Sequence, residues 1–165
     1  MTSTPGVTPS QTVGPFFWFG LCARPCNELA RGGVRVAGRV LDGAGEPIPD
    51  AMVEIWQADE SGRYRGNFGW ARCGTEDDGR FWFATVKPGR VDRQAPHLAV
   101  LVFARGLLKP VLTRMYFPDE DNGADPVLAT VAPERRATLV AVPEGDGLRF
   151  DVHLQGERET VFFAV

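Results

Sequence analysis

The chain has 165 residues, a formal net charge of −3 and 44% hydrophobic residues, which are typical of one globular domain with its own core. The slight acidity argues against nucleic acid or anionic membrane as a partner, because both attract a basic face and the sequence contains no basic cluster. The 19 glycines and 13 prolines favour many turns and short strands over long helices.

Residues 1–33 are expected to form an N-terminal arm and linker. Residues 1–10 are rich in Thr, Ser and Pro and predict an extended segment, whereas residues 16–19 place four aromatic side chains in a row. Because exposed aromatic surface is unfavourable in water, the arm should dock on the chain's own core or on another chain. The apolar run 13–21 follows no Lys or Arg and is too short to span a bilayer, so neither a signal peptide nor a membrane helix is expected.

The cysteine content favours a reducing compartment. Cys22, Cys26 and Cys73 are an odd number in a chain large enough to fold without disulfides, so we expect a cytoplasmic protein. Cys22 and Cys26 have a spacing found in some zinc sites, but no second pair of ligands lies nearby in the sequence. A catalytic Cys73 would need a basic neighbour, and His97 and His153 are the only imidazoles. Zinc binding and thiol catalysis are therefore not favoured.

Two strands with a turn between them follow the arm. Alternating, β-branched runs predict strands at 34–41 and 51–56. The glycines and prolines between the runs predict a surface loop that joins the two strands as an antiparallel hairpin. In the second strand, Val53 and Ile55 should share one face.

Strand patterns continue to the C-terminus. Further strands are predicted at 80–86, 98–103, 111–117, 137–142 and 148–155, a short helix at 127–131, and a turn at 144–147. The run 98–103 is nearly all apolar, so we expect it to be buried on both faces. These patterns predict an all-β fold, a sandwich or barrel of mostly antiparallel strands with an extended N-terminal arm and at most one or two short helices.

Motifs with a known chemistry are few. The sequence has no Gly-rich phosphate loop, no GxSxG elbow and no HExxH helix. Its tyrosines and histidines are Tyr64, Tyr116, His97 and His153. On the residues alone, His97 and Tyr116 are interpreted as packing residues of strands rather than as metal ligands.

Ordered segments along the whole chain resemble the intradiol ring-cleavage dioxygenases. They are TPSQTVGPFF (8–17), GRVLDGAGEPIPDAMVEIWQADESGRYRG (38–66), KPG (87–89), APHLAVLVFARG (95–106), LTRMYF (112–117) and RFDVHLQGERETVFF (149–163). The resemblance implies a β-sandwich over residues 34–165. It also implies the family's chemistry, in which Fe(III) held by two tyrosines and two histidines supports cleavage of a catechol by O2 between its hydroxyl-bearing carbons.

Carried over by position, the family's iron site is incomplete in this chain. Tyr64 matches the first tyrosine and His97 the first histidine, but Val91 stands at the second tyrosine and Ala99 at the second histidine. Gln94 replaces an arginine that iron-bearing subunits carry three residues before the first histidine. Val and Ala have no donor atoms, so we expect neither a metal site nor catalytic residues here. This pattern resembles the alpha subunits of the family's heteromeric members, whose homologous beta subunit carries Fe(III).

The resemblance also implies substrate-binding residues at a subunit interface. Thr12, Gly14 and Pro15 would shape the beta subunit's pocket for a small aromatic substrate, with the following aromatic residues anchoring the arm. Arg105 would lie near that pocket and favour a carboxylated catechol electrostatically. On the residues alone, Arg105 is equally a surface arginine at the end of a strand.

Two alternatives stay open at this point. One is a β-sandwich interaction module without an enzymatic partner, which gives no reason for the full-length resemblance. The other is a homomeric metalloenzyme that uses Tyr64, His97 and unconventional ligands, and it predicts iron and colour in the isolated chain.

Overall fold

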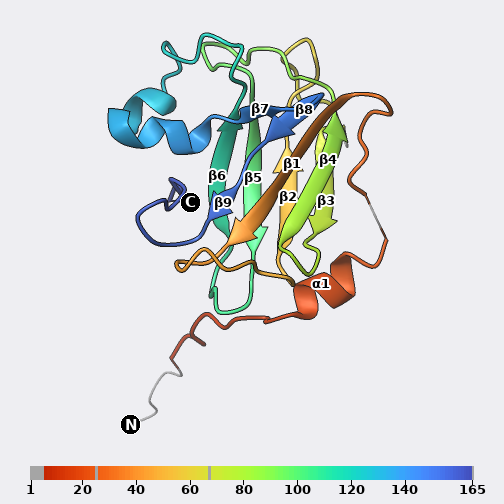
Figure 1. Cartoon of the computed structure of the whole chain (residues 1–165), viewed down its shortest axis with the longest axis vertical. Helices are drawn as coiled ribbons and strands as arrows, with labels where there is room; N and C mark the ends of the chain where they lie inside the picture. Colours follow the sequence, from red (N-terminus) through yellow and green to blue (C-terminus); the bar gives the residue numbers. More distant parts are fainter. Residues whose placement is uncertain (1–5, 25, 67, 165) are drawn as a thin grey trace.

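The computed structural model describes residues 6–24, 26–66 and 68–164, which form two β-sheets packed face to face (Figure 1). The first sheet has the order β4 (Arg80–Thr85), β1 (Val34–Leu41), β8 (Gly147–Arg149) and β7 (Val142–Glu144), and β9 (Val152–His153) also pairs with β1. The second sheet has the order β3 (Trp70–Gly74), β2 (Met52–Trp56), β5 (His97–Phe103) and β6 (Val111–Tyr116). The predicted all-β sandwich is confirmed.

Alternating side chains of the two sheets form the main core. Successive residues of a strand point to opposite faces, so each strand contributes every second side chain to the space between the sheets. The first sheet contributes Val36, Val40, Phe81 and Phe83, and the second contributes Val53, Ile55, Leu98, Val100 and Val102. Val53 and Ile55 share the buried face, as predicted.

The predicted hairpin is wrong, because its two strands belong to different sheets. β1 pairs with β4 in an antiparallel manner and with β8 and β9 in a parallel manner, whereas β2 pairs with β3 and β5. Alternation identifies a strand with one apolar face but does not identify its neighbour. Placing β1 and β2 in opposite sheets lets both apolar faces meet in one core.

The C-terminal part differs from its predicted strands. Residues 133–139, placed partly in a strand, form the 3-10 helix η2 (Pro133–Leu139), which begins with Pro and Glu as helix starts commonly do. The predicted helix at 127–131 is the 3-10 helix η1 (Leu128–Thr130). The predicted strand at 148–155 is divided into β8 and β9, both running along the edge of β1.

A close approach of two backbones marks the break between β8 and β9. A Cβ atom at Gly38 in β1 would collide with the carbonyl oxygen of Phe150, so only glycine fits there. The Phe150 N–H donates to the Ala37 carbonyl at 2.8 Å. Further along β1, the Arg39 N–H donates to a side chain instead of a backbone carbonyl, namely the Asp151 carboxylate, at 3.0 Å.

β5 is buried on one face, not on both as predicted. Leu98, Val100 and Val102 are buried, whereas the intervening residues are only partly covered. These intervening side chains lie on the outer face of the second sheet, which also carries the candidate site.

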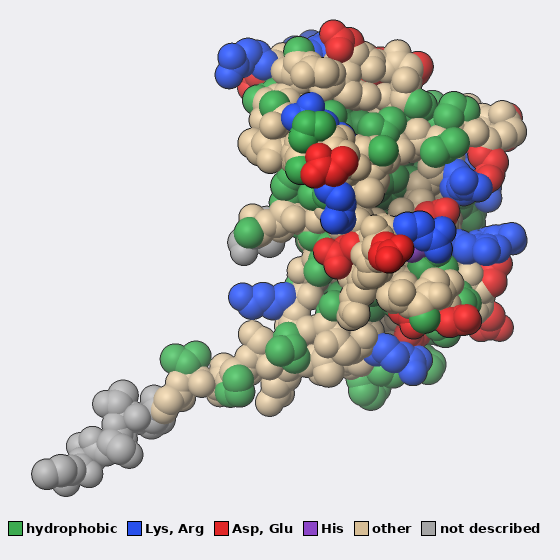
Figure 2. Space-filling model, turned by 60° about the vertical axis from the view of Figure 1, so that its left-hand side comes forward, with side chains coloured by type: hydrophobic (Ala, Val, Ile, Leu, Met, Phe, Trp, Pro, Cys, Tyr) green, Lys and Arg blue, Asp and Glu red, His purple; other side chains and the backbone are tan. Residues whose placement is uncertain are grey.

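The arm docks on the body through one side of a short helix, α1 (Phe16–Leu21). The Phe17 ring lies 4.9 Å from that of Phe103, and the Trp18 indole N–H donates to the Thr75 carbonyl at 3.0 Å. Phe16 and Phe19 remain 69% and 65% exposed. Figure 2 shows the arm extending away from the body, with hydrophobic side chains along it.

Residues 1–5 and Pro25 of the predicted arm lie outside the described residues. Among the residues that the structure describes, no helix combines the length and apolarity needed to cross a membrane.

Candidate functional site

The positions matched to the family's iron ligands lie near one end of the second sheet. His97 and Ala99 are two residues apart on β5 and therefore project from the same face. Ala99 is paired with Trp56 of β2 on one side and with Arg114 of β6 on the other. Tyr116 is the cross-strand partner of His97. The sheet register thus gathers these side chains on the outer face.

Tyr64 reaches this face from the loop between β2 and β3. Its ring stacks on that of Trp56 with centroids 6.1 Å apart and planes only 6° from parallel, and 46% of the residue is exposed. Such stacking stabilises an aromatic pair beyond the area that it buries. The stack places Tyr64 over the outer face of β2.

His97 is buried and uses one ring nitrogen within the protein. Its Nδ1 lies 2.8 Å from the Ala95 carbonyl oxygen, which can only accept, so Nδ1 donates and Nε2 is left unprotonated in the neutral ring. Burial lowers the pKa of His97, which favours the neutral ring. The Nε2 lone pair is therefore not used in a hydrogen bond to Ala95, as a metal ligand at the family's first histidine position requires.

A polar network lies beside His97. The Arg114 guanidinium donates from Nη1 to the Gln94 amide oxygen at 2.7 Å and to the Tyr116 hydroxyl at 3.4 Å. The Tyr116 hydroxyl donates in turn to Asp125 at 3.1 Å. Burial raises the pKa of Tyr116 to about 12, so its hydroxyl stays protonated. Arg114 was not predicted as a site residue, because its role depends on the pairing of β5 with β6.

The residues present do not fit the Fe(III) centre of the family. Val91 and Ala99 offer no donor atom, which leaves Tyr64 and His97 as two of four ligands. Among the described residues, no group of three or more His, Cys, Asp and Glu side chains is arranged to hold a metal ion.

The predicted substrate residues of the arm lie next to one another just before α1. Gly14 has a φ of 65° and its N–H donates to the Thr12 hydroxyl at 3.2 Å. The Pro15 carbonyl accepts from the Trp18 N–H at 3.1 Å and so begins the helix. Thr12 is exposed and Gly14 and Pro15 are partly exposed, so this turn faces solvent in the isolated chain.

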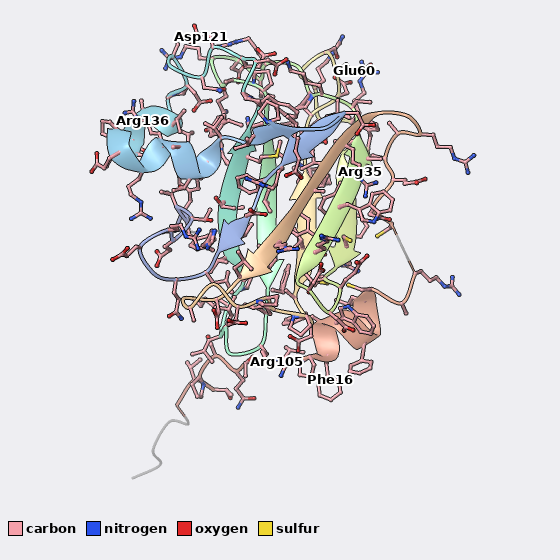
Figure 3. All side chains as sticks on the ribbon, viewed as in Figure 1. Phe16, Arg35, Glu60, Arg105, Asp121 and Arg136 are labelled. Carbon is pink, nitrogen blue, oxygen red and sulfur yellow. The ribbon has the colours of Figure 1, made fainter. Side chains whose placement is uncertain are left out.

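Arg105 follows β5 at the same end of the molecule as α1, as the labels of Arg105 and Phe16 show in Figure 3. Its Nε and Nη2 donate to one carboxylate oxygen of Asp50, at 2.7 and 2.6 Å. The Asp50 side chain is 11% exposed and the Arg105 side chain 62% exposed. The hydrogen bond to Asp50 raises the pKa of Arg105. A buried carboxylate therefore holds an exposed guanidinium in place.

The loop that carries Arg105 also contacts the arm. Gln11, Val13 and Phe17 line a cavity of about 110 Å³ together with residues of the segment 103–110. The structure therefore brings the predicted substrate residues to one end of β5. His97 begins β5 and Phe103 ends it, so the incomplete iron site lies roughly 20 Å away at a rise of about 3.4 Å per residue.

The three cysteines are free and partly buried. Burial raises the pKa of Cys22 to about 11 and also raises the pKa of Cys73. A thiol with a raised pKa is a weak nucleophile, so this arrangement does not favour cysteine catalysis.

Comparisons with known proteins agree with this geometry. A family profile described as "Dioxygenase" matches residues 27–156. The chain is 43% identical to a protocatechuate 3,4-dioxygenase alpha chain of Burkholderia cepacia, over 96% of this chain and 97% of the relative. It is 32% identical to a protocatechuate 3,4-dioxygenase beta chain of the same organism, over 76% of this chain and 65% of the relative. The dioxygenase domain of a carbohydrate-binding fusion protein from Streptomyces sp. SirexAA-E has a similar structure, with a TM-score of 0.64, 28% identity, and coverage of 90% of this chain and 98% of that domain.

Proposed function

Because the chain belongs to the intradiol ring-cleavage dioxygenase family, we propose that it is the alpha chain of a protocatechuate 3,4-dioxygenase. The assembled enzyme would insert both atoms of O2 into protocatechuate and produce 3-carboxy-cis,cis-muconate, a step of aromatic catabolism in the beta-ketoadipate pathway. The observation that carries this proposal is the similarity to an alpha chain along nearly the full length of both proteins.

The partner of this chain would be a homologous beta chain that holds Fe(III). Support comes from the ligand positions, since Val91 and Ala99 cannot bind a metal. The bound ferric ion would supply the activation of the catechol and O2. The similarity to a beta chain fits a hetero-oligomer built from two related sandwiches.

The contribution of this chain would be the wall of the beta chain's pocket. Thr12, Gly14 and Pro15 form an exposed turn, and α1 behind them presents Phe16 and Phe19 for contact with a partner. An apolar helix face of this kind is stabilised by burial in an interface. The arm and linker, residues 1–33, would therefore dock at the subunit interface.

Arg105 would select for the carboxylate of the substrate. A guanidinium has five N–H donors. Nε and Nη2 of Arg105 donate to Asp50, and the remaining N–H groups of the guanidinium are free to donate to a substrate carboxylate. The buried Asp50 would act as a positioning residue that fixes the direction of the guanidinium.

The test compares this chain purified alone with the chain co-expressed with a beta chain. Iron content, tyrosinate-to-iron absorption in the visible range and protocatechuate-dependent O2 uptake are measured for both preparations. Iron, colour and O2 uptake in the pair alone support the proposal. Iron and activity in the isolated chain support a homomeric metalloenzyme, and a chain that never associates with a beta chain supports an interaction module.

The free thiols fit a cytoplasmic location, which fractionation of cells tests directly.

A further inference from the structure

An arginine from β6 reaches the face where the family places its metal. Arg114 is directly opposite Ala99 in the pairing of β5 with β6. Cβ atoms of directly opposed residues in an antiparallel pair lie about 4.5–5.5 Å apart, so the two side chains share one space above the sheet. A histidine at position 99 would therefore lie directly beside the Arg114 side chain.

The guanidinium of Arg114 is held by groups that belong to the same site. It donates to the amide oxygen of Gln94, the residue that replaces the family's arginine, at 2.7 Å. The backbone N–H of Gln94 donates to the carbonyl of Val91 at 2.8 Å, so Arg114 is also tied to the second empty ligand position. An arginine from another strand thus binds the residue that stands at the family's arginine position.

The charge of Arg114 is not neutralised by contact with a carboxylate. Among the described residues, its hydrogen-bond acceptors are the neutral side chains of Gln94 and Tyr116. The nearest acid of the network, Asp125, accepts from the Tyr116 hydroxyl and from backbone N–H groups rather than from the guanidinium. A guanidinium keeps its charge at every physiological pH.

We propose that Arg114 is the resident cation of this site and occupies the place of the family's metal ion. Two cations repel at short range, and the repulsion is strong where water is partly excluded. Restoring the missing ligands would therefore not restore iron binding while Arg114 is present. The inference rests on membership of the family, but it does not depend on pairing with a beta chain.

The test rebuilds the ligand set in the full chain. Val91→Tyr and Ala99→His are combined in a double variant, and Arg114→Gln is added to give a triple variant. Both are dialysed against Fe(III), and bound iron and tyrosinate-to-iron absorption are measured. We expect the triple variant to hold about tenfold more iron per chain than the double variant, and to be coloured, because the competing cation is gone.

Controls separate the local cation from other effects. Arg93 is an exposed arginine four residues after the KPG segment. In a second triple variant, Arg93→Gln takes the place of Arg114→Gln and should leave iron uptake as low as in the double variant. Arg114→Met provides a second uncharged replacement, and thermal melting confirms that each variant is folded. Equal iron content in the double and triple variants, whether high or absent, overturns the proposal.

Discussion

Truncating the outward face of α1 should weaken association with a beta chain. Phe16 and Phe19 are 69% and 65% exposed. A phenylalanine presents about 200 Å² of side-chain surface, so the two together offer roughly 270 Å². At about 25 cal/mol per Å², complete burial would contribute roughly 6–7 kcal/mol. Incomplete burial, the Cβ atoms kept by alanine and the ordering of the arm reduce this to about 3 kcal/mol, or about 150-fold in Kd.

The measurement is the Kd of the Phe16→Ala, Phe19→Ala variant for a purified beta chain, by titration calorimetry. α1 has no buried residue, so the variant's own melting temperature should stay close to that of the unmodified chain. Val142→Ala is the matched control, because Val142 is 51% exposed but lies on β7 in the first sheet, away from α1. A Kd for the double variant within twofold of the control would refute the assignment of α1 to the interface.

Three further changes test other parts of the structure. Arg105→Ala should raise the KM of the assembled enzyme for protocatechuate by about tenfold and leave its iron content unchanged. Arg35→Ala, on the first sheet, should leave this KM unchanged. Equal KM values for the two variants would count against a substrate role for Arg105. Thr75→Val should lower the free energy of unfolding, measured by urea titration, by about 1–3 kcal/mol, because the buried Thr75 hydroxyl accepts from the Ala51 N–H and donates to the Ile48 carbonyl. A loss below 0.5 kcal/mol, roughly the scatter of surface substitutions, would contradict this. Burial acts to raise the pKa of Asp125, but the hydrogen bonds that its carboxylate accepts outweigh this effect and lower the pKa. The contribution of Asp125 to stability is therefore full above its unfolded pKa of 3.8 and is lost as the pH falls through the lower folded pKa. Asp125→Asn should therefore destabilise the chain more at pH 7 than at pH 3, and an equal loss at both would show that ionisation is unimportant.

The strands follow from local pattern, but their partners do not. β1 has the predicted bounds because its alternation of apolar residues is regular and ends at a Gly-rich and Pro-rich loop. Its pairing with β4, β8 and β9 depends on residues far away in the chain, which periodicity cannot identify. α1 was missed because no Ser, Thr, Asp or Asn side chain caps it and its residues are mostly aromatic.

The candidate site shows the same division. The absence of donors at Val91 and Ala99 is a property of residue type and is read directly from the sequence. The position of Arg114 opposite Ala99 comes from the register of two strands, so no local signal marks it. The stack of Tyr64 on Trp56 depends likewise on how a loop folds over β2.

The edge of β1 that receives β8 and β9 determines when this chain can finish folding during its synthesis. The hydrogen bond from Arg39 to Asp151 spans 112 residues, and every contact on that edge involves residues after position 146. The first sheet therefore stays incomplete until the residues of β8 and β9 have been synthesised and have left the ribosome. Contacts of such long range close slowly, and an unpaired strand edge invites pairing with other chains in the meantime. An assembly that requires the finished first sheet must therefore follow the pairing of β8 and β9 with β1.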